Sequence, residues 1–213
     1  MPQLIRQSGN TRVGAGPGYF LATQQVATLD KPTGLDRAQG DVHPQGNPHI
    51  QLDPRNIAAV AKALTARLAS LDAANAEYYH ARGADFQARW QQAMARWEAA
   101  AAPLKGASVV VIHVDQRYLC RWLGLHQLAA TEPKPGVPPS ADYLADLVAK
   151  LSANRPQMIL RNAYNDPKAA DWLSKKVGAP VVTLPFSVGG TPEAKDLFGL
   201  FNDTIQRLVA ARQ

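Results

Sequence analysis

Three histidines are the residues of this chain whose types and positions best suit metal chemistry. His43 and His49 lie six residues apart in the loop GDVHPQGNPHIQLDP, and His113 follows the apolar run SVVVI. Neutral imidazole nitrogens bind transition metals, zinc in particular. The six-residue spacing is a weak metal signal, because defined zinc motifs use tighter spacings. His43 could instead be a solvated loop residue, and His113 could be hydrogen-bonded between a strand and a helix.

The loop around the first two histidines is conformationally restricted. Pro44, Gly46 and Pro48 alternate with polar residues there. A stiff loop loses less entropy when a ligand fixes it, which favours a binding role.

Signatures of catalysis are scarce. The sequence contains no GxSxG, HExxH or P-loop pattern. The single cysteine, Cys120, excludes an internal disulfide and any multi-cysteine zinc or iron-sulfur site, and its apolar surroundings predict a buried thiol. GAGPG near the start lacks the strand and helix that a dinucleotide site requires, and the glycines of SVGGTPEA are typical of a flexible turn.

Composition limits the class of protein. With 213 residues, 46% of them hydrophobic, the chain can bury a core, and no apolar run approaches the length of a membrane helix. The net charge is +6, but Lys and Arg are spread evenly and only Lys175 and Lys176 are adjacent, which argues against nucleic-acid binding. The start MPQLIRQSGN does not read as a secretory signal.

Two helices are predicted in the first half of the chain, after about fifty residues with little helical pattern. Asp53 is a suitable N-cap and Pro54 a suitable first residue for an amphipathic helix that ends near Leu71. A second helix is predicted from Asp72 to near Pro103, about 45 Å long at 1.5 Å per residue. Its stripe of aromatic residues and methionine is typical of a core-facing side.

After Gly106 the sequence alternates between strand and helix patterns, which predicts an α/β lobe with a mostly parallel sheet. Functional residues of such lobes gather where strands end, and His113 lies at such an end. The last helix is predicted to begin at Thr191 and Pro192. The domains we expect are residues 1–71, a connecting helix at 72–103, and an α/β lobe at 104–213.

The order of these features resembles a known family. NPHIQLDP is followed by EYYHARGADFQARW in the long helix, and then by VVIHVDQRYLCRWLGL, PPSADYLADL and ADWLSKKVGAPVVTL. This order is similar to that of the substrate-binding proteins of zinc and manganese ABC importers, the cluster A-I family, over residues 3–213. The sharpest matches are NPH-x-x-LDP and a His-x-x-x-x-Tyr followed by Gly-Leu, which here are His113, Tyr118, Gly124 and Leu125.

The resemblance implies two α/β lobes joined by one long rigid helix, with the metal between the lobes. By motif position it implies that His49 and His113 are metal ligands, one from each lobe. It implies Zn²⁺ as the bound ion before Mn²⁺, since imidazole suits zinc better. It also implies an ABC permease as partner and a periplasmic location.

The sequence departs from the family pattern at both ends. The first strand-helix units of the family, a further histidine ligand and a signal peptide find no match here, and Pro185 stands where the family has a late carboxylate. We therefore expect an incomplete N-terminal lobe, from a truncated chain or a start assigned too far downstream. His43, Asp115, another group or a second chain would then have to complete the metal site.

Three functions remain open on the sequence. The leading one is a receptor that binds zinc, without transforming it, and delivers it to an importer. The alternative is a transport-inactive interaction module that self-associates through an exposed sheet edge. The third, an enzyme that uses His113 as a base, ranks last because no motif places a nucleophile or an acidic partner.

Overall fold

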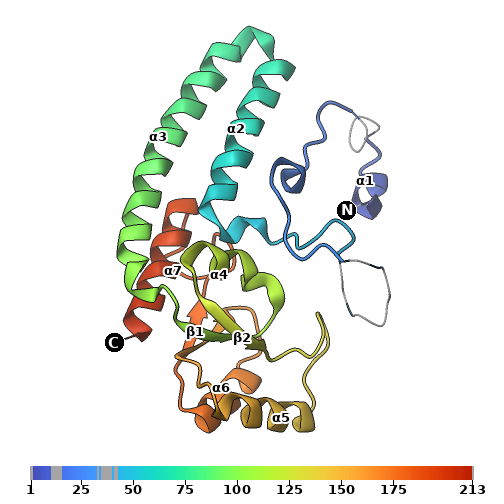
Figure 1. Cartoon of the computed structure of the whole chain (residues 1–213). Helices are drawn as coiled ribbons and strands as arrows, with labels where there is room; N and C mark the ends of the chain where they lie inside the picture. Colours follow the sequence, from blue (N-terminus) through green and yellow to red (C-terminus); the bar gives the residue numbers. More distant parts are fainter. Residues whose placement is uncertain (1, 11–15, 33, 35–39, 41–42, 213) are drawn as a thin grey trace. The chain divides into compact units, whose positions relative to one another are not determined.

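The chain divides into two compact units. The computed structural model describes residues 2–10, 16–32, 34, 40 and 43–212 (Figure 1). The first unit is Met1–Ala27 with Arg55–Gln91, and the second is Thr28–Pro54 with Gln92–Gln213. Part of the GAGPG segment and two residues of the histidine loop, Asp41 and Val42, lie outside the described residues. The predicted domain bounds stay a prediction, but residues 28–54 group with the C-terminal lobe by contact.

The first unit is built around two long helices. It contains the short helix α1 (Pro2–Gln7), the 3-10 turn η1 (Ala22–Gln25), α2 (Pro54–Leu71), and the beginning of α3 (Ala76–Ala101). The side chain of Gln87 donates a hydrogen bond of 2.8 Å to the carbonyl oxygen of Ala58. A Cβ at Gly83 would lie 2.5 Å from the hydroxyl of Thr65, so glycine permits the close approach of α2 and α3. The described part of this unit contains no strand.

The long helix α3 is slightly shorter than the sequence predicts. It has 26 residues, because the 3-10 turns η4 (Ala73–Asn75) and η5 (Ala102–Leu104) take up its two ends. The helix continues from the first unit into the second. Trp90 and Trp97, from the predicted aromatic stripe, are both buried. The other residues of the stripe, Tyr79, Phe86 and Met94, are half-buried, so the stripe faces the interior, as its spacing indicated.

A four-stranded parallel sheet forms the centre of the second unit. Its strands are β1 (Ser108–Val111), β2 (His126–Ala130), β3 (Met158–Asn162) and β4 (Val181–Leu184), in the spatial order β2-β1-β3-β4. The chain thus turns from β1 to one side for β2 and then to the other side for β3. Loops leave the carboxyl ends of the strands in opposite directions at that point, which is where α/β sheets usually bind ligands.

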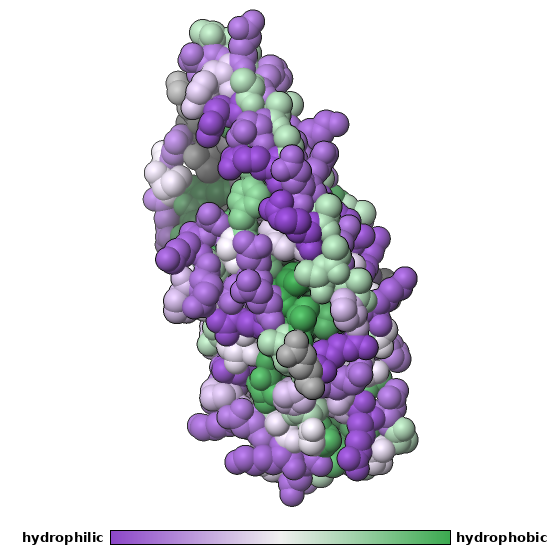
Figure 2. Space-filling model, turned by 90° about the vertical axis from the view of Figure 1, so that its left-hand side faces the viewer, coloured by the Kyte–Doolittle hydropathy of each residue, from purple (hydrophilic) through white to green (hydrophobic). Residues whose placement is uncertain are grey.

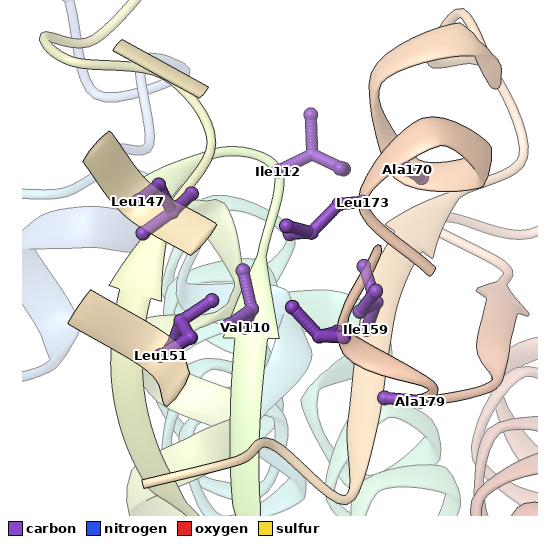
Figure 3. Packing of buried hydrophobic residues seen from close by; sticks show 9 residues of the cluster. Val110, Ile112, Leu147, Leu151, Ile159, Ala170, Leu173 and Ala179 are labelled. Carbon is purple, nitrogen blue, oxygen red and sulfur yellow. The ribbon is translucent and has the colours of Figure 1, made fainter. Parts of the chain in front are cut away.

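Helices cover both faces of this sheet (Figure 1). On one face, α5 (Ala141–Ser152) and α6 (Lys168–Val177) pack apolar side chains against β1 and β3 (Figure 3). On the other face lie α4 (Arg117–Leu123) and α7 (Leu197–Ala211). The ring of Phe201 there lies 5.1 Å from that of Trp97 and 5.6 Å from that of Trp122. Two apolar layers explain why β1 is a continuous hydrophobic run rather than an alternating one.

The last helix begins later than the sequence predicts. The Thr191-Pro192 pair does not open a helix; α7 begins at Leu197, where Asp196 accepts a hydrogen bond of 2.7 Å from the Gly199 amide. The Thr191 hydroxyl instead donates to the buried carboxylate of Asp203, at 2.6 Å. Asp196 therefore caps α7, and Thr191 contacts that helix from the segment before it instead of opening it.

Hydrophilic residues predominate on the face shown in Figure 2, where hydrophobic residues form small separate patches. None of the described helices is long and apolar enough to cross a bilayer.

Candidate metal centre

The three histidines line one small cavity in the second unit. Its volume is about 180 Å³, and all of its lining residues belong to that unit. They are Asp30, His43, Asn47, His49, His113, Val114, Arg117, Gln127 and Pro135. The structure therefore brings His43, His49 and His113 to one place from two distant segments of the chain.

The imidazole rings are neighbours with edge-on orientations. The ring centre of His49 lies 6.3 Å from that of His43 and 5.8 Å from that of His113. A shared zinc ion would require one nitrogen of each ring at about 2.0–2.1 Å from a common point. Among the described residues, no three metal-binding side chains already converge in this way. The rings are thus gathered in one cavity without forming a finished coordination shell.

The backbone of His49 is held by the asparagine of its own motif. Asn47 is buried, and its side-chain oxygen accepts a hydrogen bond of 3.1 Å from the His49 amide. The Asn47 side-chain nitrogen donates to the carbonyl oxygen of Val114 at 2.8 Å. One side chain therefore ties the loop of His49 to the segment that follows His113.

Tyr118 makes the second link between these segments. Its hydroxyl donates to the carbonyl oxygen of Asn47 at 2.7 Å and accepts from the Leu29 amide at 2.9 Å. The side chain is 1% exposed. The two family motifs, NPH and His-x-x-x-x-Tyr, thus meet through Tyr118, a role that sequence reasoning missed because nothing local signals it.

A carboxylate contacts His113. Oε2 of Glu132 lies 2.6 Å from Nδ1 of His113 and also accepts a hydrogen bond of 2.9 Å from the Gly136 amide. Sequence reasoning did not single out Glu132. The available signal was its place directly after the extended piece HQLAAT, since neighbouring parallel strands end at the same edge of a sheet.

Asp115 does not line the cavity. It is completely buried, and its Oδ2 accepts hydrogen bonds from the side chains of Asn162, at 2.5 Å, and Tyr164, at 2.9 Å. Burial raises the pKa of this carboxyl to about 6, although the bond from Tyr164, the positive field of His113 and the bond from Asn162 oppose the shift. The structure thus places the fourth candidate ligand in a buried hydrogen-bond network with Asn162 and Tyr164, outside the lining of the cavity.

The segment after β4 contacts His49 through an aromatic ring. Pro185 is followed by Phe186, whose ring centre lies 5.4 Å from that of His49. The Gln51 side chain donates to the Phe186 carbonyl oxygen at 3.5 Å, a long bond. The apolar ring of Phe186 therefore lies beside His49 and contributes to its burial.

The pKa of His49 is expected to lie far below that of an ordinary histidine. Burial lowers its pKa to about 4, and repulsion from protonated His113 and His43 adds to the effect. In the metal-free protein the ring should stay neutral, and able to bind metal, down to about that pH. The proton NMR signals of the His49 ring, followed between pH 3.5 and 8, should give this midpoint. A midpoint near the usual 6.5 would contradict the burial argument.

The lowered pKa of His49 also makes the stability of the protein depend on pH. The unfolded chain binds a proton on His49 at a higher pH than the folded chain does, so this residue lowers stability as pH falls from about 6.5 to 4. Asp115, whose pKa is raised, acts in the opposite direction between about 4 and 6. Stability alone is therefore a poor test here, and the residue-specific NMR titration is the direct one.

A parallel α/β unit with imidazoles gathered at the carboxyl end of its sheet is typical of a ligand-binding protein with a metal-type site. Comparison with known proteins defines the class further. The model of one family, described as the periplasmic component A of the zinc-uptake complex (ZnuA), matches residues 2–211. The chain belongs to this family, which comprises solute-binding proteins of zinc and manganese ABC importers.

Individual relatives agree with this family. The chain is 26% identical over 150 residues to the high-affinity zinc uptake system protein ZnuA of Bacillus subtilis, a match that covers 70% of this chain and 47% of the relative. The chain thus matches about half the length of that curated relative. A zinc-bound ZnuA deletion mutant shares its fold, with a TM-score of 0.70, 24% identity, and coverage of 90% of this chain and 68% of that one. FpvC of Pseudomonas aeruginosa, solved with Mn²⁺, has a TM-score of 0.66, 21% identity, and coverage of 83% and 68%.

Proposed function

We propose that this protein binds a divalent transition metal, zinc first, and delivers it to an ABC importer. His49 and His113 are the proposed ligands from the two family motifs, and His43 is the proposed third. The observation that carries the proposal is the single cavity lined by all three histidines. The rest of the proposal, the permease as partner and a periplasmic location, rests on the family to which the chain belongs.

The chemistry of the lining residues favours zinc. Three imidazole nitrogens suit Zn²⁺, whereas Mn²⁺ prefers oxygen ligands. Asp30 is the carboxylate among the lining residues, and Arg117 contacts it at 3.3 Å. A carboxylate already paired with a guanidinium is a weaker oxygen ligand than a free one. Manganese is therefore the secondary candidate, although FpvC, a fold relative, has been solved with it.

The proposed mechanism is reversible coordination, with no bond of the cargo made or broken. The histidines must be neutral to bind, so uptake releases any proton they carry. Because the pKa of His49 is about 4, this ligand is ready at neutral pH without releasing a proton. The small rearrangement that the ring spacing requires would be part of binding, since the rings are neighbours but do not yet converge.

Titration of the metal-free chain with Zn²⁺ and, separately, Mn²⁺ in a calorimeter tests this proposal. We expect saturable zinc binding with one ion per chain, and weaker manganese binding. Light scattering in the same samples would reveal self-association. A chain that binds neither ion, or that forms a dimer whether or not metal is present, would support the alternative of an interaction module instead.

A further inference from the structure

We propose that Glu132 is the positioning residue for His113: it holds the Nδ1 proton and thereby presents a bare Nε2 to the metal. The inference rests on the proposed function, since it assigns His113 a metal. It concerns a residue that neither the sequence motifs nor the family match singles out.

The contact has the geometry of a strong charge-assisted hydrogen bond. The distance from Nδ1 of His113 to Oε2 of Glu132 is 2.6 Å, slightly below the range of about 2.7–2.9 Å for N–H···O bonds between ionised partners. The two side chains are 19% and 20% exposed, so solvent screens the interaction less than it would at the surface. A neutral imidazole can donate from one nitrogen only, and an ionised carboxylate can only accept. The proton of neutral His113 therefore belongs on Nδ1.

The sheet sets Glu132 opposite His113. The amide of Thr131 donates to the carbonyl oxygen of Val111 at 2.9 Å, and the amide of Glu132 donates to that of Ile112 at 3.2 Å. These bonds extend the pairing of β1 with β2 beyond the strand ends, up to the residue before His113. The backbone register thus places Glu132 beside His113, where its side chain can reach the ring.

The loop after Glu132 fixes the carboxylate itself. The Gly136 amide donates to Oε2 at 2.9 Å, and Gly136 has a φ of 77°, which glycine adopts without strain. Lys134 and Val137 form an isolated antiparallel bridge inside the same loop. The segment EPKPGVPP contains four prolines, which restrict its alternatives. Glu132 is therefore held in place before any metal binds, as a residue that orients a ligand should be.

Orienting a histidine through its second nitrogen has a known chemical effect. It fixes the tautomer and the ring direction and raises the basicity of the nitrogen that binds metal. Loss of such a partner typically weakens metal affinity by about 10- to 100-fold. We expect that range for Glu132→Ala, and a smaller loss for Glu132→Gln, because an amide oxygen still accepts the Nδ1 proton.

The test uses the full chain with Zn²⁺ as the probe and has two readouts. Nitrogen-15 NMR of the His113 ring in the metal-free protein reports the tautomer, and competition with a chelator reports zinc affinity. We expect the Nδ1-protonated tautomer in the wild type and in E132Q, and a mixture of tautomers in E132A. Glu77→Gln, an exposed change on α3, is the matched control and should alter neither readout.

The outcomes separate this inference from the proposed function. If the wild type binds no zinc, the proposed function fails, while the tautomer of His113 still decides the role of Glu132. If zinc binds but E132A keeps both the wild-type tautomer and an affinity within twofold, Glu132 does not position His113. For E132A, a weaker affinity with an unchanged tautomer would also overturn the inference, since it would mean a general structural loss. Should E132A not fold, the zinc affinity of E132Q decides. A loss of more than twofold but less than about tenfold would support the inference, and an affinity within twofold of the wild type would overturn it.

Discussion

Replacing either His49 or His113 by alanine is expected to weaken zinc binding by a factor on the order of 100 or more, about 2.8 kcal/mol. Each change removes one of the proposed nitrogen ligands, and water is a poorer ligand for zinc than imidazole. His43→Ala should have a smaller effect. His43 is exposed in a loop, and fixing its side chain on the metal costs conformational entropy that offsets part of the gain from the third imidazole. Calorimetric titration or chelator competition at pH 7.5 measures all three variants.

Two exposed histidines provide matched controls for this series. His126→Ala, at the start of β2, and His80→Ala, on α3, remove an imidazole outside the cavity and should leave zinc affinity unchanged. Circular dichroism and thermal unfolding would show whether each variant is folded. Wild-type affinity in folded His49→Ala and His113→Ala proteins would rule out the proposed site.

Replacing Tyr118 by phenylalanine is expected to destabilise the protein by about 1–3 kcal/mol, the usual cost of leaving buried polar groups unpaired. The hydroxyl satisfies the Leu29 amide and the Asn47 carbonyl oxygen at once. Phenylalanine fills the same space, so the loss is one of hydrogen bonds and not of packing. Because Asn47 holds the His49 backbone, zinc affinity should also fall, although the variant keeps every proposed ligand.

Urea unfolding of metal-free protein gives the first quantity, and zinc competition gives the second. Tyr78→Phe is the control, because Tyr78 is 62% exposed on α3 and should affect neither. A Tyr118→Phe protein with unchanged stability and unchanged zinc affinity would show that the two motif segments are held together by other contacts.

The strands and most helices could be predicted from the sequence because their signals are local. The apolar run at 108–112, the proline after Asp53 and the glycine after α6 each act within a few residues. The start of α7 was predicted wrongly, because Thr191-Pro192 and Asp196 are both local helix-start signals. The bond from Thr191 to Asp203, twelve residues away, is invisible in a local pattern.

The candidate site could be predicted in part. His49 and His113 are identified by motif position, and the structure places both in one cavity, with His43 beside them. Asp115 is close to His113 in sequence, yet its side chain enters a buried network with Asn162 and Tyr164 instead. Nearness along a chain does not fix the direction of a side chain, because a 3-10 turn follows His113 and redirects the next residues.

The sequence by itself determined the α/β class, the long helix, the poverty of catalytic signatures and the identity of the main candidate ligands. These depend on residue types and on short-range periodicity, which any chain displays before it folds. Only the tertiary structure decided that Glu132 meets His113, that Tyr118 joins the two motifs, and that Asp115 bonds to Asn162 and Tyr164 rather than lining the cavity. The register of the sheet and the packing of the loops bring these residues together from distant parts of the chain. Their hydrogen bonds can form only once donor and acceptor lie about 3 Å apart, so no local sequence pattern predicts them.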